Sequence, residues 1–360
     1  MKRPQKPSLL VFRIGSLGDT VVSLPAFHFI RDEHPGHRIV LLTNAPVDGG
    51  VKASSAYSIL NGTGVIDDYI EYPIGRIDWK SLARVAGRIR SFRPELAYYL
   101  MPKRSTYQRS RDALFLAAAG LLRVHGLWGS GASEHRPSGD QGRYESEAQR
   151  LARSIGFDGR PLRLEHFSLR LSADEQQSAD IALAALPKPL PLVSISIGTK
   201  APAKDWGHDR WIEMLRQLKM LQAQIGLVFI GSGDEKERCQ SMLQEWGGAG
   251  LNLCGRLSPR QSAAVMARTV LYAGHDNGPM HLASAVGTRV VALFAARTRP
   301  GIWFPFGDHN EVFYNQLDCY NCGLNVCVER QMACIRQIQP IEVARRIDLM
   351  LNSSLRAESR

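Results

Sequence analysis

Short apolar runs alternate with segments of helical periodicity in the first half of the chain. The apolar runs cover residues 9–14, 39–42 and 96–100. Hydrophobic positions recur at helical spacing from 21 to 30, and a second helix is predicted over 79–92. Strands separated by helix-length segments are typical of parallel βαβ units whose sheet is covered on both faces. The pattern therefore predicts a parallel α/β sheet in this half.

The sequence LPKPLP at residues 186–191 interrupts this alternation. Three prolines at alternate positions cannot continue a helix, so we interpret the segment as an extended connector between domains. The alternation then restarts, with strands predicted at 192–197, 226–230, 270–273 and 290–294 and helices at 209–221, 235–246, 258–268 and 279–286. We predict two doubly wound domains, 1–186 and 187–338, and a C-terminal helix, 339–360, that can pack back on the first domain.

Length and composition agree with two globular domains. A chain of 360 residues and 40.0 kDa exceeds one ordinary domain, and 44% hydrophobic with 22% charged residues is typical of globular proteins. The longest nearly uninterrupted apolar run, 113–122, is about half as long as a membrane span. Arg13 cuts short the apolar stretch that follows the basic N-terminus, so we expect no signal peptide and a cytoplasmic protein.

The net charge is +11, from 45 lysines and arginines against 34 acidic residues. This excess favours an anionic partner such as a nucleotide, a phosphorylated glycan, a nucleic acid or an anionic lipid surface. The basic residues are dispersed and no nucleic-acid recognition motif occurs, so we expect no nucleic-acid partner. Peripheral contact with the cytoplasmic face of the inner membrane remains compatible with the charge.

The segment Gly15-Ser-Leu-Gly-Asp19 lies where the first predicted strand turns into a helix. Ligands of open α/β sheets bind at this carboxyl edge, and free helix amides favour anions. Neither a G-x-G-x-x-G motif nor a P-loop motif occurs in the chain. Asp19 is either an ordinary acid in the first turn of a helix or a general base that faces an interdomain cleft.

A second strand end, Asp276-Asn277-Gly278-Pro279-Met-His281, is more specific. The strand delivers Asp276, the Asn-Gly pair makes a turn, and the proline opens a helix without losing a hydrogen bond. Free backbone amides then favour a pyrophosphate, and the imidazole of His281 can contact an anion. The alternative is a structural turn that binds no ligand.

Two further loops follow strands of the second half. The first loop contains Thr199, Lys200 and Lys204, which suit a diphosphate, although a solvated basic loop fits them equally well. The second loop contains Glu235, whose carboxylate can accept hydrogen bonds from ribose hydroxyls. No Asp-x-Asp pair, which would hold a divalent cation on a diphosphate, occurs in the chain. Lysine and helix dipoles would have to stabilise the diphosphate instead.

Three blocks of sequence carry a resemblance to a known family. They are IGSLGDTVVSLPAF, KDWGHDRWIEML and HDNGPMHLASAVGTRVVALFAARTRPGIWFPFG. The chain resembles glycosyltransferase family 9, the ADP-heptose:lipopolysaccharide heptosyltransferases, and the match is collinear over nearly its whole length. The resemblance implies a GT-B fold, two Rossmann-like doubly wound parallel-sheet domains facing a central cleft. It also implies an inverting, metal-independent transfer of a heptose or related sugar from an ADP-sugar to a lipopolysaccharide-type or other surface glycan.

The resemblance also assigns roles by position. Asp19 corresponds to the family's proposed base, and Glu235 corresponds to its ribose-binding acid. The positions that match donor-diphosphate and donor-sugar ligands are Thr199, Lys204, Asp276, Asn277, Gly278, Pro279 and His281. The chain departs from the common pattern at Lys200 and Asn277, where the family often has threonine.

A basic cluster after the strand ending near residue 100 is the candidate acceptor site. It comprises Lys103, Arg104, Arg109 and Arg111, to which we add Arg13. These side chains can bind phosphate or carboxylate groups of an anionic glycolipid or glycan. The alternative is a solvated basic face.

The four cysteines Cys319, Cys322, Cys327 and Cys334 fall within sixteen residues. They are compatible with a structural Zn or Fe site, with reduced thiols or with one or two disulfides. Catalysis itself requires no cofactor in this interpretation.

Two other functions compete with a glycosyltransferase. A GT-B-fold sugar-nucleotide epimerase would convert the donor without an acceptor. A non-catalytic module would bind a nucleotide sugar without turnover.

Overall fold

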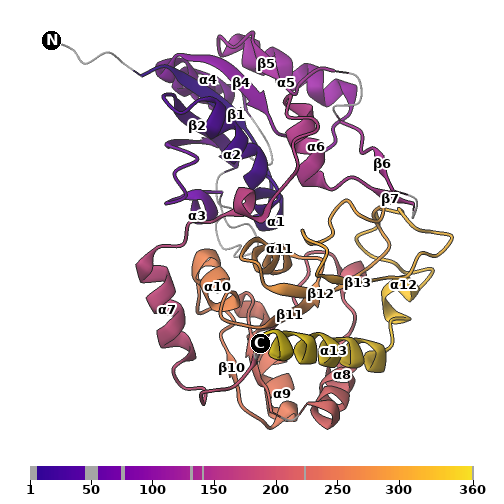
Figure 1. Ribbon diagram of the computed structural model, residues 1–360. Coiled ribbons are helices and arrows are strands. Elements are labelled where there is room, and N and C mark those ends of the chain that lie inside the picture. Colours follow the sequence, from indigo (N-terminus) through magenta and orange to yellow (C-terminus); the bar gives the residue numbers. More distant parts are fainter. Residues whose placement is uncertain are drawn as a thin grey trace. The chain divides into compact units, whose positions relative to one another are not determined.

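The computed structural model describes residues 6–44, 56–73, 78–129, 133–139, 142–222 and 224–358. The chain divides into two compact units, Met1–Arg170 and Leu171–Arg360. Each unit has its own parallel β-sheet with helices packed on it (Figure 1), which confirms the predicted class.

The sheet of the first unit has the strand order β3-β2-β1-β4-β5, and all its pairs are parallel. Its strands are β1 (Ser8–Phe12), β2 (Arg38–Asn44), β3 (Asp68–Tyr72), β4 (Pro94–Tyr99) and β5 (Val124–His125). The central strand β1 is buried along its whole length, and its Leu9 lies opposite Ile39 of β2 and Leu96 of β4. This register brings the carboxyl ends of β1 and β4 to the same edge.

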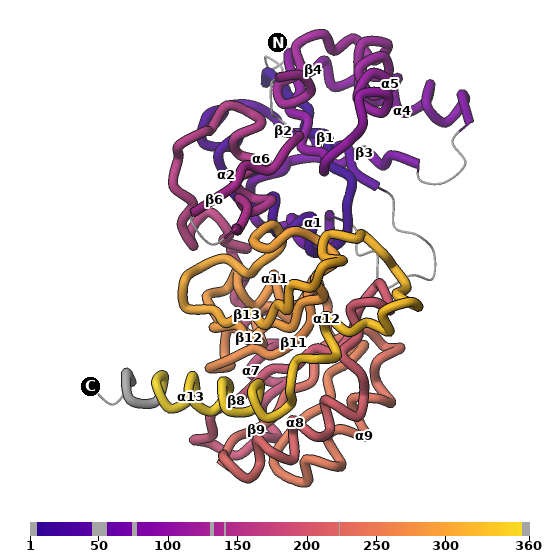
Figure 2. The backbone as a smooth tube through the Cα atoms, turned by 90° about the vertical axis from the view of Figure 1, so that its right-hand side faces the viewer, coloured from indigo at the N-terminus to yellow at the C-terminus, as the bar shows by residue number. Residues whose placement is uncertain are grey.

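Helices cover both faces of this sheet (Figure 2). They are α1 (Leu17–Val21), α2 (Leu24–Glu33), α3 (Tyr57–Leu60), α4 (Trp79–Phe92), α5 (Thr106–Ala118) and α6 (Glu147–Ser154), with a 3-10 turn at Leu164–Phe167. Helices α4 and α5 bury Val85, Ile89 and Leu116 in the core on one face. Helices α2 and α6 pack against each other on the other face. Two short antiparallel strands, β6 (Pro137–Ser138) and β7 (Arg143–Tyr144), precede α6.

The second unit has the strand order β10-β9-β8-β11-β12-β13, again with parallel pairs only. Its strands are β8 (Leu192–Ser196), β9 (Gly226–Phe229), β10 (Gly250–Asn252), β11 (Leu271–His275), β12 (Arg289–Phe294) and β13 (Glu311–Tyr314). Strands β8 and β11 are neighbours, with Val193 opposite Leu271. The loops that follow these two strands therefore start side by side.

The helices of the second unit include the C-terminal one. They are α7 (Ala173–Leu183), α8 (His208–Leu221), α9 (Lys236–Trp246), α10 (Pro259–Met266), α11 (Gly278–Ala285), α12 (Ala333–Arg336) and α13 (Pro340–Glu358), with 3-10 turns at Pro202–Lys204 and Gly233–Glu235. Helix α13 packs against α8 and buries Val343 and Ile347 in the same core as Trp211. Its apolar face is used within the second unit, and the predicted packing of this helix on the first domain stays a prediction.

The boundary between the units also differs from the predicted one at 186/187. Helix α7 belongs to the second unit because it packs against α10, and the guanidinium of Arg260 forms an ion pair with Glu175. Arg268 pairs with Asp180 at the other end of α7. The proline-rich segment 186–191 therefore joins α7 to β8 inside one unit.

None of the described helices combines the length and the hydropathy that crossing a bilayer requires.

Candidate functional site

The loops after β8 and β11 meet at Lys204. Its Nζ lies 2.6 Å from Oδ2 of Asp276 and donates to the Asp276 carbonyl oxygen at 3.1 Å. Asp276 is buried and Lys204 is mostly buried, so the ammonium group is held at the end of β11, next to the start of α11. The structure therefore brings together two residues that are 72 positions apart and were both predicted to serve a diphosphate.

The amide side chain of Asn277 forms hydrogen bonds to other residues of the protein. Its Oδ1 accepts from the Met280 amide (2.9 Å) and from the Tyr272 hydroxyl (3.1 Å). Its Nδ2 donates to Ser196 Oγ (3.2 Å) and to the Gly198 carbonyl oxygen (2.8 Å). An amide side chain has two donors and one acceptor oxygen, so these four bonds occupy it. Asn277 thus caps α11 and braces the loop.

The first turn of α11 offers one amide to an anion. Pro279 has no amide hydrogen, and the Met280 amide is already capped by Asn277. In the described structure this leaves the Gly278 amide at the helix N-terminus, close in sequence to the Lys204–Asp276 pair. The ring of His281 is buried and lies 6.2 Å from the ring of Trp303, so the imidazole packs beneath the loop.

His275 holds the lysine loop in place, and the sequence analysis missed it. The ring is fully buried; Nδ1 lies 2.9 Å from the Ile197 carbonyl oxygen, and Nε2 accepts from the Trp206 amide at 3.1 Å. Burial lowers the pKa of His275 to about 4, so the ring is neutral near pH 7 and carries its proton on Nδ1. The only signal in the sequence was a polar residue at the end of a buried strand.

Glu235 folds back over the ends of β8 and β9. A Cβ atom at Gly198 or at Gly231 would collide with the Glu235 carboxylate where it lies, so glycine at these two positions leaves room for that carboxylate. Ser232 Oγ donates to Oε1 at 2.7 Å. In the loop after β8, the Thr199 hydroxyl donates to the Ala201 carbonyl oxygen (3.0 Å), and Lys200 lies at an exposed position.

Asp19 lies in the first turn of α1, at the carboxyl edge of the other sheet. Its Oδ2 accepts from the amide and from the hydroxyl of Ser16, both at 2.7 Å, which forms a capping box. The side chain keeps 25% of its surface exposed. A Cβ atom at position 15 would collide with Asp19, so Gly15 permits this close approach. Asp19 is therefore both a helix N-terminal acid and an accessible carboxylate.

Arg13 ties Asp19 to a buried ionic network. Its side chain is 1% exposed; Nη2 donates to the Asp19 carbonyl oxygen (2.8 Å) and lies 3.5 Å from Oδ1. Nη1 donates to the Leu100 carbonyl oxygen and lies 3.8 Å from Oε1 of Glu147. This placement makes Arg13 a support for Asp19 and leaves it no surface for an acceptor.

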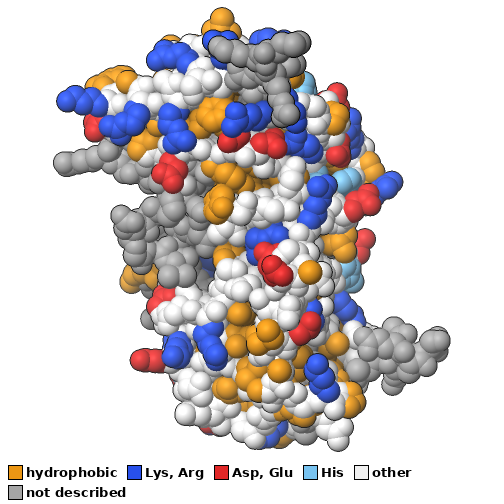
Figure 3. Space-filling model, turned by 90° about the vertical axis from the view of Figure 1, so that its left-hand side faces the viewer, with side chains coloured by type: hydrophobic (Ala, Val, Ile, Leu, Met, Phe, Trp, Pro, Cys, Tyr) orange, Lys and Arg blue, Asp and Glu red, His pale blue; other side chains and the backbone are white. Residues whose placement is uncertain are grey.

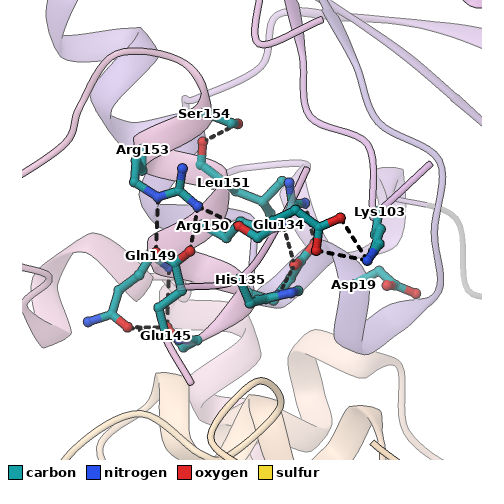
Figure 4. Close-up of polar contacts among 12 residues, drawn as sticks. Asp19, Lys103, Glu134, His135, Glu145, Gln149, Arg150, Leu151, Arg153 and Ser154 are labelled. Carbon is teal, nitrogen blue, oxygen red and sulfur yellow. Dashed lines mark hydrogen bonds and ion pairs between the residues drawn. The ribbon is translucent and has the colours of Figure 1, made fainter. Parts of the chain in front are cut away.

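Glu147 is the centre of that network and was also missed. Arg150 donates to both of its oxygens at 2.7 Å, and Nε2 of His135 lies 3.0 Å from Oε2. Burial alone would raise the pKa of Glu147, but hydrogen bonds from Arg150 and His135 and the charge of Arg13 outweigh it and hold the pKa at about 2. Figure 4 shows the surroundings, where helix α6 also supplies Arg153 to Glu145.

The predicted acceptor cluster is divided among internal partners. Arg104 and Arg111 both pair with the buried carboxylate of Asp112, at 3.1 and 2.8 Å. The hydroxyl of Tyr99 donates to the same carboxylate (2.6 Å). The remaining members are placed as follows: Lys103 pairs with Glu134 on the surface (Figure 4), and the guanidinium of Arg109 lies over the Trp128 ring. Lys103 and Arg111 keep about half or more of their surface exposed.

The four clustered cysteines lie in the segment from the end of β13 to α12. Burial raises the pKa of the Cys334 thiol, and the other three cysteines of the cluster raise it further. All six described cysteines are free thiols. Across the described ranges, no three His, Cys, Asp or Glu side chains form a group that could hold a metal ion. The thiols are thus near one another without forming a ligand set.

A family model, glycosyltransferase family 9 (heptosyltransferase), matches residues 148–333, more than half of the chain. The chain belongs to glycosyltransferase family 9. Within the matched part lie Thr199, Lys204, Glu235 and Asp276, together with His275.

A curated relative and several solved structures resemble this family 9 chain. Lipooligosaccharide heptosyltransferase 2 of Campylobacter jejuni is 24% identical over 157 residues, which cover 42% of the chain and 48% of the relative. The chain thus matches about half the length of that relative.

Among solved structures, a family 9 glycosyltransferase from Veillonella parvula has a TM-score of 0.73 at 17% identity and covers 98% of this chain and 99% of its own. ADP-heptose lipopolysaccharide heptosyltransferase II of E. coli has a TM-score of 0.69 at 19% identity, with coverage of 98% and 100%. The iron-containing dodecameric glycosyltransferase TibC of enterotoxigenic E. coli has a TM-score of 0.55 at 16% identity, with coverage of 98% and 78%. These likenesses confirm the GT-B fold class.

Proposed function

We propose that this family 9 member is an inverting, metal-independent glycosyltransferase. It would move a heptose or a related sugar from an ADP-sugar to a lipopolysaccharide-type or other surface glycan. The observation that carries the proposal is the Lys204 ammonium, fixed by Asp276 beside the N-terminus of α11. Structures of an E. coli heptosyltransferase with a similar fold contain ADP and a fluorinated ADP-heptose.

The second unit would bind the donor. Lys204 and the Gly278 amide would face the diphosphate, which gains negative charge as it leaves the anomeric carbon. A positioned charge or amide of this kind contributes roughly 2–4 kcal/mol to transition-state stabilisation. Glu235, which lies over Gly198 and Gly231, would accept hydrogen bonds from the ribose hydroxyls.

Asp19 of the first unit would remove the proton from the acceptor hydroxyl. Its Oδ2 accepts from Ser16, while among the described residues Oδ1 meets the Arg13 guanidinium alone, at 3.5 Å, so Oδ1 is the oxygen that can take the proton. General base catalysis of this type contributes about 10²–10⁴-fold. Lys103 and Arg111 keep exposed surface with which to meet anionic groups of the acceptor.

No step of this reaction passes through a metal. The four clustered thiols do not fit a Zn or Fe site as the described structure places them, and we assign them no catalytic part. Because the sequence has no Asp-x-Asp pair to hold a cation on the diphosphate, turnover should survive dialysis against EDTA. A loss of turnover that Zn²⁺ or Fe²⁺ restores would contradict this assignment.

The proposal is tested by incubating the protein with ADP-heptose, with and without a deacylated core-oligosaccharide acceptor. We expect ADP release only when the acceptor is present. Conversion of the donor without acceptor would identify a sugar-nucleotide epimerase. ADP binding without turnover of any donor in a panel of nucleotide sugars would identify a binding module.

A further inference from the structure

Helices α4 and α5 leave an outer surface that no other described element covers, which we call the α4–α5 face. Each helix buries one of its sides in the core. Helix α4 buries Val85, Ala86 and Ile89, and α5 buries Asp112 and Leu116. Their C-terminal ends are joined by a hydrogen bond from Arg90 to the Ala118 carbonyl oxygen (3.1 Å). The two helices therefore lie side by side, and their outer sides form one surface (Figures 1 and 2).

Large apolar side chains are exposed on this face and at its two ends. Trp79 is 86% exposed, Tyr107 is 78%, Leu114 is 73%, and Leu122, just after α5, is 84%. Tyr107 and Leu114 are seven residues apart, so they lie on the same outer stripe of α5. Single exposed hydrophobic residues are normal, but Tyr107 and Leu114 on one stripe, with Trp79 exposed at the start of α4 and Leu122 exposed after α5, mark the exposed sides of the two helices as an interaction surface.

The same face is strongly basic. Residues 79–93 contain Lys80, Arg84, Arg88, Arg90 and Arg93 and no acid, and residues 106–123 contain Arg109, Arg111 and Arg123. The one acid in these two segments is Asp112, which is buried and paired with arginines. Asp78, the N-cap of α4, is the nearest other acid in the sequence. The left-hand side of the molecule in Figure 1 likewise carries Lys and Arg side chains beside hydrophobic ones on the part formed by the first unit (Figure 3).

We propose that the α4–α5 face docks on an anionic lipid bilayer. Lysines and arginines would meet the lipid phosphates, while Trp79, Tyr107, Leu114 and Leu122 would enter the interfacial region, as in amphipathic helices that lie in the membrane plane. The inference rests on the proposed function, because a glycolipid acceptor lies at a bilayer surface. A nucleic acid fits less well because the exposed centre of the face is aliphatic and aromatic rather than polar.

Cosedimentation with vesicles tests the proposal without using turnover. The full chain is mixed with vesicles of phosphatidylcholine alone or of phosphatidylcholine with phosphatidylglycerol. We expect binding to the anionic vesicles that falls with added salt. Equal binding to both kinds of vesicle, or to neither, would overturn the proposal.

Two pairs of variants locate the surface. Lys80→Gln/Arg84→Gln should weaken binding to anionic vesicles by about 25-fold, since each cation near the surface contributes about fivefold. Trp79→Ser/Leu114→Ser should weaken it at least tenfold. The matched controls lie in the second unit: Arg336→Gln/Arg345→Gln removes two exposed charges, and Met220→Ser/Leu349→Ser removes two exposed apolar side chains. The controls should bind as the natural protein does.

Calorimetric ADP affinity, measured on every variant, separates this inference from the proposed function. We expect it to stay unchanged, which also shows that the variants fold. Equal losses in test and control variants would contradict docking through this face. Loss of dimerisation or of RNA binding in the test variants, with vesicle binding retained, would assign the face to a second copy of the chain or to RNA.

Discussion

The two candidate sites are held in place by different physical means. On the donor side, one ion pair, Lys204–Asp276, is supported by a neutral ring, His275, and by the neutral amide of Asn277. On the base side, Asp19 is supported by a chain of buried charges that runs through Arg13 to Glu147 and Arg150. Neutral supports depend little on a partner's charge, whereas each member of a buried ionic chain depends on the others.

This difference predicts how damage to each site acts. The donor loop is built from residues that directly follow neighbouring strands, so the fold itself brings them together. The base is built on contacts between α1, the end of β4 and α6. Damage to the network should therefore unfold or loosen the first unit, whereas damage to the donor loop should weaken a ligand.

The largest expected effect is on turnover in Asp19→Asn. Asparagine keeps the size of the side chain and can still accept from Ser16, but it has no basicity. The kcat should fall by about 10²–10⁴-fold while ADP affinity stays the same. A variant with more than about a tenth of the natural kcat would rule out Asp19 as the general base.

The next effect is on stability in Glu147→Gln. The substitution leaves Arg13 and Arg150 buried without their shared counter-charge, which should lower the free energy of unfolding by roughly 3–5 kcal/mol. Glu134→Gln is the matched control, because its ion pair with Lys103 is exposed and should contribute at most about 1 kcal/mol. Urea unfolding measures both, and equal effects would mean that the buried network does not stabilise the first unit.

A smaller effect concerns the pH dependence of the free energy of unfolding, to which His275 contributes. Its folded pKa of about 4 lies below the value of 6.5 for an unperturbed histidine, so the folded state favours the neutral ring. The neutral ring's contribution to the free energy of unfolding is fully present above pH 6.5. It is lost as the pH falls from 6.5 to 4, by about 3 kcal/mol in total. Urea unfolding across this range should show a flatter pH dependence in His275→Gln, whereas replacement of the exposed His309 by glutamine should leave the slope unchanged.

The smallest effect concerns the diphosphate. Lys204→Ala should weaken ADP binding by about tenfold or more, since a charge-assisted hydrogen bond contributes about 1.5–3 kcal/mol. Lys200→Ala removes the same charge from an exposed position in the same loop and should change ADP affinity less than threefold. Calorimetry with ADP compares them, and equal losses would show that only the net charge of the loop matters.

The sequence by itself determined the parallel α/β class and most of its elements. Helix α4 occupies the predicted residues 79–92, and α10 begins after the predicted cap Ser258 with Pro259 in its first turn. These features are local: periodicity, capping and proline act within one or two turns, so they can be read from the chain. The Asp276–His281 turn was likewise visible, because its residues are consecutive.

Only the tertiary structure decided which polar groups meet. Arg104 and Arg111 share one buried acid, Asp112. The proline-rich segment lies inside the second unit because α7 packs on α10. Arg13 supports Asp19 because β1, β4 and α6 converge on it, and the tautomer of His275 follows from partners on two other segments. Such assignments depend on burial and on contacts between distant residues, and periodicity carries no information about either.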